Sequence, residues 1–162
     1  MQNQIVLLTL LNDSITGLAG TKIESRSKEK MLVRRFYEEI VNETRSDKLE
    51  EIFSPKIIWH DPLLPTGEVS GIEDFRNVLE MFRSAFPDLH VTVEDQTQEN
   101  ERVVTRFTID GTNKSELLGV SATGRKFKVS GISIIRFEQG KAVEEWIEED
   151  GLGLMRQLGV VK

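Results

Sequence analysis

The chain of 162 residues contains no cysteine and only two histidines, His60 and His90. Without cysteine it can form neither disulfides nor thiolate nucleophiles, and zinc–thiolate sites and iron–sulfur clusters are excluded as well. Two histidines also argue against a metal site built from several imidazole ligands. We therefore expect a protein that works without a bound metal ion.

Positive charge is also scarce. Lys and Arg together number 21 against 27 Asp and Glu, which gives a formal net charge of −6. Nucleic acid is therefore not an expected partner, because phosphate binding needs a surplus of clustered cations. No stretch reaches the roughly 18–20 apolar residues of a membrane-spanning helix, so no membrane partner is expected. The remaining composition is typical of one globular domain, for which we predict a cytoplasmic location.

The first 27 residues differ from the rest and are interpreted as an N-terminal extension, with a single domain over 28–162. Their apolar run, 5–11, is too short to span a membrane, and the first basic residue is Lys22. Three explanations stay open from sequence: a segment docked on the domain or a neighbouring subunit, a secretory signal cleaved near 17–20, or translation that starts at Met31.

Apolar spacing after residue 28 changes from a helical period to a period of two. The predicted helices lie over 28–44, 46–54 and 71–86, and the predicted strands over 56–61, 89–98, 102–112, 125–138 and 142–150. Helices grouped ahead of an antiparallel meander imply an α+β fold, in which the helices cover one face of a curved sheet. Such a sheet forms a cone, and its mouth is a natural pocket for a hydrophobic small molecule.

The other face of this sheet would have no helical cover, and exposed sheet is usually buried against a partner. Val103, Thr105, Ile132 and Ile134 are apolar or small enough to meet such a partner. We therefore predict a homodimer packed sheet to sheet.

Five short motifs, in this order, resemble those of one family. They are Leu32–Glu39, Trp59–Pro62, Phe86–Leu89, Leu117–Val120 with Thr123–Arg125, and Gly140-Lys141-(x)4-Trp146-(x)3-Asp150 followed by Leu154–Gly159. Over roughly 28–160 the chain resembles the SnoaL-like polyketide cyclases, also called ester cyclases, of the NTF2-like superfamily. The resemblance implies the NTF2-like cone. It also implies cofactor-independent ring closure of a polyketide ester by intramolecular aldol condensation, or a related lyase or isomerase reaction on a small molecule.

The resemblance places the catalytic acid/base at Asp150. A carboxyl group in an apolar cone can take an α-proton and return it, since burial raises its pKa. The alternative role for Asp150 is to cap the helix that follows it. His60 is a second catalytic candidate, which could bind a substrate carbonyl or else bond only to its own surroundings. His90 is expected to be solvated.

On the last strand, alternation puts Glu144, Trp146, Glu148 and Asp150 on one face and the residues between them on the other. A face with tryptophan and acids suits a pocket, so Trp146 and Glu148 are predicted to bind substrate. The other predicted substrate-binding residues are Trp59, Tyr37, Arg106 and Arg136. Arg106 is expected to reach Asp150 or Glu148, or else to lie at the surface.

Two positions depart from the cyclases that this chain resembles. Arg136 is the best match to a histidine that some of them use to activate substrate, and an arginine cannot act as a base near neutral pH. Ser133 stands where many relatives have aspartate. These differences leave two alternatives open: a noncatalytic small-molecule-binding module of the same cone, and an epoxide hydrolase. The second is disfavoured because the Arg-x-Asp pair it needs is absent at Arg106.

Overall fold

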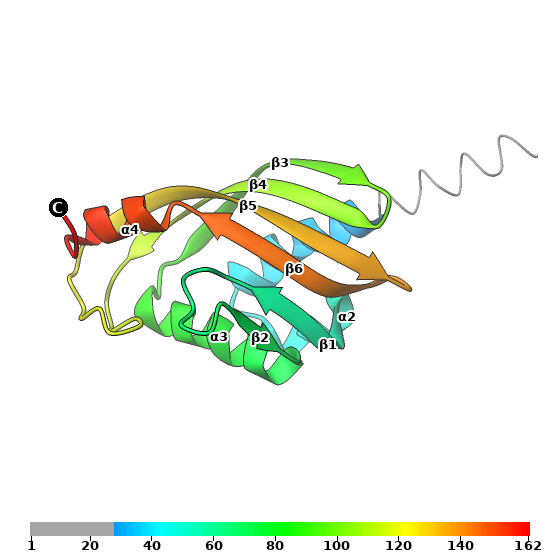
Figure 1. Ribbon diagram of the computed structural model, residues 1–162, viewed down its shortest axis with the longest axis horizontal. Coiled ribbons are helices and arrows are strands. Elements are labelled where there is room, and N and C mark those ends of the chain that lie inside the picture. The colour runs from blue at the N-terminus through cyan, green and yellow to red at the C-terminus, as the bar shows by residue number, and fades with distance from the viewer. Residues whose placement is uncertain (1–27) are drawn as a thin grey trace, which may run out of the picture.

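A six-stranded sheet organises residues 28–162, the part of the chain that the computed structural model describes. The strands are β1 (Phe53–His60), β2 (Glu68–Ser70), β3 (His90–Glu99), β4 (Arg102–Thr112), β5 (Lys126–Glu138) and β6 (Lys141–Glu149). Their order is β2-β1-β6-β5-β4-β3 (Figure 1). β1 and β6 run parallel, and every other neighbouring pair is antiparallel.

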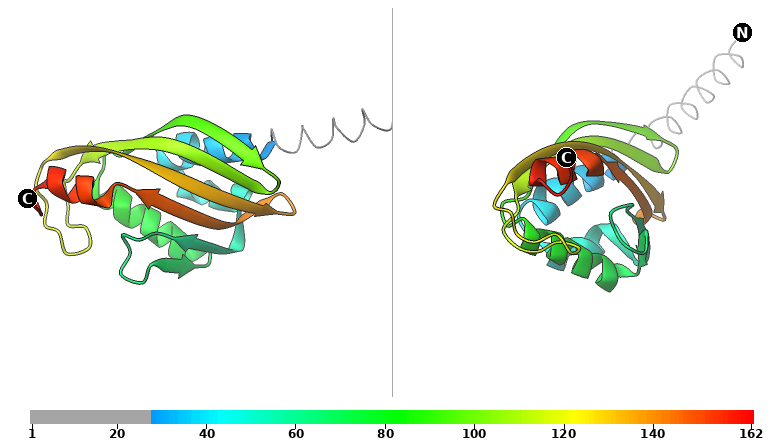
Figure 2. Two further views of the ribbon diagram at one scale, coloured as in Figure 1. Left: turned by 45° about the horizontal axis from the view of Figure 1, so that its top comes forward. Right: turned by 60° about the vertical axis from the view of Figure 1, so that its left-hand side comes forward.

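Helices fill the concave side of this sheet. Residues 28–35 are α-helical and continue into the π-helix η1 (Phe36–Val41), and η2 (Ser46–Lys48), α2 (Leu49–Ile52), α3 (Ile72–Ala85) and α4 (Gly151–Leu158) complete the set. Figure 2 shows the sheet curving over η1 and α3. The predicted α+β cone is therefore confirmed. The N-terminal extension predicted over 1–27 lies outside the described residues.

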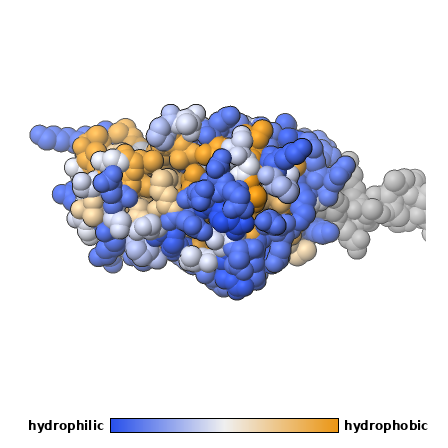
Figure 3. Space-filling view, turned by 90° about the horizontal axis from the view of Figure 1, so that it is seen from below, coloured by the Kyte–Doolittle hydropathy of each residue, from blue (hydrophilic) through white to orange (hydrophobic). Residues whose placement is uncertain are grey.

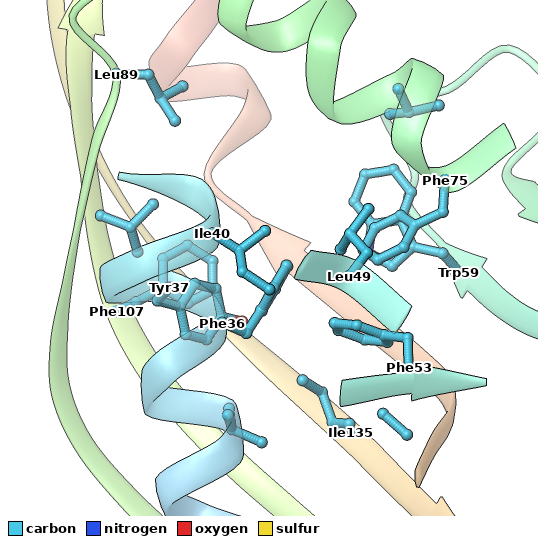
Figure 4. Packing of buried hydrophobic residues seen from close by; sticks show 14 of the residues in the cluster. Phe36, Tyr37, Ile40, Leu49, Phe53, Trp59, Phe75, Leu89, Phe107 and Ile135 are labelled. Atoms are coloured by element: carbon cyan, nitrogen blue, oxygen red, sulfur yellow. The ribbon is translucent and has the colours of Figure 1, made fainter. Parts of the chain in front are cut away.

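Aromatic packing joins the helices to the sheet. Phe36 of η1 lies 4.9 Å from Phe53 of β1 between ring centroids, and Phe53 lies 5.0 Å from Phe75 of α3 (Figure 4). Trp59 also packs against Phe75, with tilted rings whose centroids lie 5.3 Å apart. Each fully buried side chain of this size contributes roughly 2–3 kcal/mol through its removal from water. These contacts fix the helices over β1 and leave the middle of the sheet free for a chamber.

Two local predictions were wrong around β1. Phe53 was placed in the helix over 46–54, but it is the first residue of the strand. Pro55 interrupts the pairing of β1 with β6, whose register shifts between Phe53 and Ile58, and this irregularity accommodates a residue without an N–H group. β2 was missed because it is only three residues long and follows a loop rich in proline and glycine.

The convex face of the sheet differs in part from the predicted partner surface. Val103 and Thr105 are fully buried on the concave side, so their assignment to the convex face was wrong. Ile132, 47% exposed, does lie on the convex face, and Ile134 shares that face by alternation along β5.

The face of the molecule seen in Figure 3 is largely hydrophilic. Figure 3 shows hydrophobic atoms gathered on the half of one face that lies away from the N-terminal trace. That end carries α4, and exposed hydrophobic residues in and after α4 include Leu152, Val160 and Val161. Within residues 28–162 no helix is both long and apolar enough to cross a membrane.

Candidate active site

A cavity of about 80 Å³ lies between the concave face of the sheet and the helices η1, α3 and α4. This chamber has room for several water molecules, since one needs roughly 10–15 Å³ on the same measure. Its wall is mostly aromatic and aliphatic. The lining residues are Phe36, Tyr37, Val41, Trp59, Asp61, Leu79, Phe82, Phe86, Leu89, Val91, Phe107, Ile109, Phe127, Val129, Glu145, Ile147, Glu149 and Leu154.

Three carboxyl groups interrupt this apolar wall: Asp61, Glu145 and Glu149. Glu145 and Glu149 lie on one face of β6 with Ile147 between them, as alternation along a strand requires. Asp61 follows the last residue of β1, which pairs with Trp146 of β6, so the topology brings it beside the same strand. No lysine, arginine or histidine is among the described residues that line the chamber, and nothing there neutralises these acids.

Glu145 is the most deeply buried of the three. Only 1% of it is exposed, and its Oε1 accepts a hydrogen bond from the Tyr37 hydroxyl at 3.3 Å. Tyr37 in turn lies 2.6 Å from the Ser133 hydroxyl. Burial raises the pKa of Glu145 to about 8, against the opposing hydrogen bond from Tyr37 and with the help of the negative charge on Asp61. Glu145 is therefore a carboxyl group that keeps its proton at neutral pH.

Glu149 and Asp61 lie in a similar environment. The pKa of Glu149 is raised to about 7. Burial is the larger cause, and the nearby negative charge of Asp61 is the smaller one. Burial also raises the pKa of Asp61, although a hydrogen bond from the Leu63 N–H to its Oδ1, at 2.7 Å, favours the charged form. Glu149 is only partly buried, so it can exchange protons with solvent. A carboxyl group with a pKa near 7 can work as acid and base at neutral pH.

Asp150 does not face this chamber. Its side chain is exposed and accepts a hydrogen bond of 2.8 Å from the Gly153 N–H, which caps the N-terminus of α4. This is the capping role that the sequence left open as the alternative. The prediction that the face of Glu144, Trp146, Glu148 and Asp150 lines the pocket was wrong, because the other face of β6 does.

The remaining residues of that face lie on the convex side of the sheet. His60 stacks on Trp146 with ring centroids 5.4 Å apart, and its two ring nitrogens lie 3.2 Å from Glu68 and Glu144. Arg136 binds Glu144 through both its Nε and a terminal nitrogen, at 3.0 and 2.9 Å. His60, Trp146 and Arg136 thus form a polar cluster with these two acids outside the chamber.

Glu148 and Arg106 are exposed on the same convex face. Of the two alternatives for Arg106, the structure shows the second: Arg106 lies at the surface, where it pairs with Asp95 of β3 at 2.6 Å and not with Asp150 or Glu148. Since no arginine lines the chamber among the described residues, the Asp–Arg–Asp arrangement of an epoxide hydrolase is not assembled there. His90 is exposed, as predicted.

Trp59 and Tyr37 do line the chamber, as the sequence predicted, and Phe107 lies 5.7 Å from Tyr37 in the same wall. The predicted list omitted Glu145, Glu149 and Asp61. Alternation along β6 grouped Glu145 and Glu149 with Ile147, but it did not show that this group, rather than the one with Trp146, faces the chamber. Among the described residues, no group of three acidic or histidine side chains is placed to hold a metal ion.

Comparison with known proteins supports the resemblance. The family model of the SnoaL-like polyketide cyclases matches residues 31–158. The chain is 31% identical over 133 residues to the aklanonic acid methyl ester cyclase DnrD of Streptomyces peucetius, covering 79% of this chain and 88% of that protein. The aklanonic acid methyl ester cyclase DauD of Streptomyces sp. (strain C5) is 30% identical over 134 residues, covering 79% of this chain and 80% of that protein.

Structural comparison gives the same answer. TsrD from Streptomyces laurentii superimposes with a TM-score of 0.75 at 32% identity, covering 84% of this chain and 98% of that one. The chain therefore belongs to the SnoaL-like polyketide cyclase family.

Proposed function

We propose that this chain closes a ring in a hydrophobic ester by an intramolecular aldol-type reaction, with Glu149 as the acid/base group. The observation that carries the proposal is a carboxyl group with a pKa of about 7 in an apolar chamber that has no lining cation. Such a group accepts a proton readily at neutral pH and returns it as readily. The cyclases that the chain matches act, by name, on aklanonic acid methyl ester.

The reaction balances with these groups alone. The Glu149 carboxylate removes a proton from the carbon next to a carbonyl group, and the resulting enolate attacks a second carbonyl carbon of the same molecule. A carbon–carbon bond forms while the π bond of the attacked carbonyl becomes an alkoxide. Glu149 then returns its proton to that alkoxide. The product is an isomer of the substrate, so the step consumes no oxidant, reductant or co-reactant.

Glu149 suits this role better than the other two chamber acids. Glu145 is fully buried and keeps its proton at neutral pH. Asp61 is held by the Leu63 N–H in a turn after β1. The resemblance pointed instead to Asp150, whose carboxylate is engaged in capping α4. The proposal therefore moves the acid/base role by one residue along the chain.

Turnover of aklanonic acid methyl ester, followed by chromatographic separation of the ring-closed isomer, tests the assignment. Glu149→Gln keeps the shape and removes titration, and we expect turnover to fall roughly 100-fold or more. Asp150→Asn is the matched control, because asparagine caps helices as well as aspartate, and turnover should stay within a few-fold. A folded Glu149→Gln protein with unchanged turnover would contradict the proposal. Loss in Asp150→Asn alone would return the role to Asp150.

The small free volume of the chamber, about 80 Å³, favours a second candidate: a noncatalytic module that holds a small hydrophobic molecule. Native mass spectrometry of the purified protein distinguishes the two. A retained ligand that leaves unchanged, together with no ring closure by the wild-type chain, would support the binding module.

We also propose that the chain forms a homodimer through the convex face of the sheet. The support is Ile132, which is 47% exposed, with Ile134 beside it on that face. Light scattering should give twice the mass of one chain, and Ile132→Glu should shift the population toward monomer. A wild-type monomer at micromolar concentration would contradict this proposal.

A further inference from the structure

The two carboxyl oxygens of Glu145 have different surroundings. Oε1 accepts the hydrogen bond from Tyr37, whereas Oε2 is buried and has no hydrogen-bond partner among the described residues. The side chain lines the chamber. A buried polar atom without a partner is costly, by the free energy needed to remove it from water. An oxygen of this kind, on a side chain that lines a cavity, is therefore a position where a ligand atom can complete the bonding.

A chain of hydroxyl groups fixes which oxygen is free. The π-helix η1 carries Tyr37, whose hydroxyl donates to Oε1 of Glu145, and Ser133 of β5 lies 2.6 Å from the same hydroxyl. Since a phenol has a single proton, the Ser133 hydroxyl must donate to the Tyr37 oxygen when Tyr37 donates to Glu145. Three elements, η1, β5 and β6, thus hold one carboxyl group in one orientation.

This orientation places the proton of Glu145. Oε1 is used as an acceptor, so the proton of the neutral acid belongs on Oε2. The ionised form would leave a charged oxygen buried without a partner, and no cation lines the chamber to compensate it. The raised pKa of Glu145 agrees with the neutral form. Of the other titratable groups that line the chamber, Asp61 and Glu149 are acids, and they oppose ionisation further.

We propose that Glu145 is a hydrogen-bond donor to the substrate, with its Oε2–H directed at the carbonyl oxygen that becomes the enolate oxygen, and that Tyr37 and Ser133 are its positioning residues. This rests on the proposed function for the identity of the reaction. The hydrogen bond itself requires only a carbonyl oxygen in the chamber. The proton stays on Glu145 throughout, and the stabilisation grows as negative charge develops on the acceptor.

Two roles are then divided between two glutamates on one face of β6. Glu149 moves a proton, and Glu145 supplies a fixed donor. This division predicts losses of different size for the same substitution. Glu145→Gln still presents an N–H donor, whereas Glu149→Gln removes the group that carries the proton.

Infrared spectroscopy of acetophenone labelled with carbon-13 at the carbonyl carbon tests the hydrogen bond without any turnover. In the wild-type chain, the carbonyl band of the bound ketone should lie at lower frequency than in an apolar solvent. Glu145→Leu should abolish this shift, Glu145→Gln should retain part of it, and Glu149→Gln should keep it. A bound ketone whose band is the same in wild type and Glu145→Leu overturns the inference, as does a chamber that takes up no ketone.

The positioning residues need a readout that simple structural damage would not imitate. Ser133→Ala and Tyr37→Phe should each reduce the frequency shift, and Ser133→Thr, which keeps the hydroxyl, should restore it. Circular dichroism checks that each variant is folded. A shift that is unchanged in folded Tyr37→Phe would remove Tyr37 and Ser133 from the inference.

Kinetics with aklanonic acid methyl ester gives the second readout. Glu145→Leu should lower kcat roughly 100-fold with a smaller change in KM, and Glu145→Gln should lower it by less than about tenfold. If Glu145→Gln is as inactive as Glu149→Gln, Glu145 transfers a proton and the inference is wrong. If the wild-type chain closes no ring, the proposed function fails, while the infrared experiment still decides the role of Glu145.

Discussion

Strand β6 carries glutamates on both faces, and the two faces treat them in opposite ways. On the convex side, burial alone would raise the pKa of Glu144, but hydrogen bonds from Arg136 and His60 bring it below its ordinary value. On the concave side, burial raises the pKa of the adjacent Glu145 to about 8, helped by the negative charge of Asp61 and opposed by hydrogen bonds from hydroxyl groups. The same residue type one position apart is thus a structural anion on one face and a neutral acid on the other. The difference is whether a cationic side chain lies within hydrogen-bond distance of the carboxyl group.

The largest expected effect is on the pH dependence of stability. The pKa of Glu145 is about 8 in the fold against an ordinary 4.5, so the folded state keeps a proton that the unfolded chain releases. The resulting stability is fully present below pH 4.5 and is lost as pH rises toward 8. Glu149, whose pKa in the fold is about 7, lowers the stability in the same direction as pH rises toward 7. Through Glu145 alone the free energy of unfolding should fall by roughly 3 kcal/mol between pH 5 and 8, and Glu149 adds to this fall.

Urea unfolding at several pH values measures this slope. Glu145→Gln should reduce this decline to the part that Glu149 contributes, because the variant has nothing to titrate at position 145. Glu144→Gln, the neighbour on the convex face, should leave the decline between pH 5 and 8 in place. A wild-type chain whose stability is flat or rises over this range would show that the concave face does not bury neutral acids.

The concave face should also be less tolerant of added volume. A Cβ at Gly131 would meet the ring of Phe107 and approach the Glu148 carbonyl oxygen to 2.8 Å, and backbone cannot move aside cheaply. Gly131→Ala should cost roughly 2 kcal/mol of unfolding free energy. Ser130→Ala, the next residue on the exposed face, is the control and should be nearly neutral. Equal stability of the two variants would mean that β5 shifts without cost.

At the end of β6, the capping role of Asp150 predicts a smaller loss. Asp150→Ala removes the acceptor for the Gly153 N–H and should cost about 1 kcal/mol. Asp150→Asn should recover most of that loss. Thermal unfolding of the two variants tests the capping role. A capping residue contributes to stability in the absence of substrate, and this contribution should be lost in Asp150→Ala and kept in Asp150→Asn.

The smallest effect is expected in the convex cluster. Arg136→Gln breaks the paired contacts with Glu144 and should cost less than about 1 kcal/mol, since partly exposed ion pairs are weak. The pKa of Glu144 should rise in this variant, and the wild-type advantage should shrink in 1 M salt. Nuclear magnetic resonance titration of the Glu144 carboxyl carbon follows the change. An unaltered titration would assign the lowered pKa to something other than Arg136.

The fold could be predicted from the local spacing of apolar residues. Which face of β6 points into the chamber could not. Alternation correctly separated Glu144, Trp146 and Glu148 from Glu145, Ile147 and Glu149. Both sets contain acids and one large apolar residue, so composition did not decide which set is buried. The decision comes from the pairing of β1 with β6, which places His60 beside Trp146 on the convex side. That pairing joins distant segments and leaves no local signal.

The partner of Arg106 shows the same limit. The sequence offered an acid near the end of β6 as one possible partner, whereas the register of β3 against β4 puts Asp95 directly opposite. Register depends on the whole ladder, including the irregularity between Val93 and Asp95. The positions of Trp59 and Tyr37 were easier to predict. A large aromatic residue on the apolar face of a helix or strand is expected to point toward the interior.

The parallel pairing of β1 with β6 has a consequence for how the chain reaches this state. His60 and Glu144, joined across these strands, are 84 residues apart in sequence. Closing so long a loop is slow compared with forming a hairpin such as β5–β6, because its entropy cost comes before its contacts form. During synthesis, β1 must also wait until almost the whole chain has emerged. Asp61 and Glu149 therefore become neighbours late in folding, and any chain stopped before β6 lacks the acidic chamber altogether.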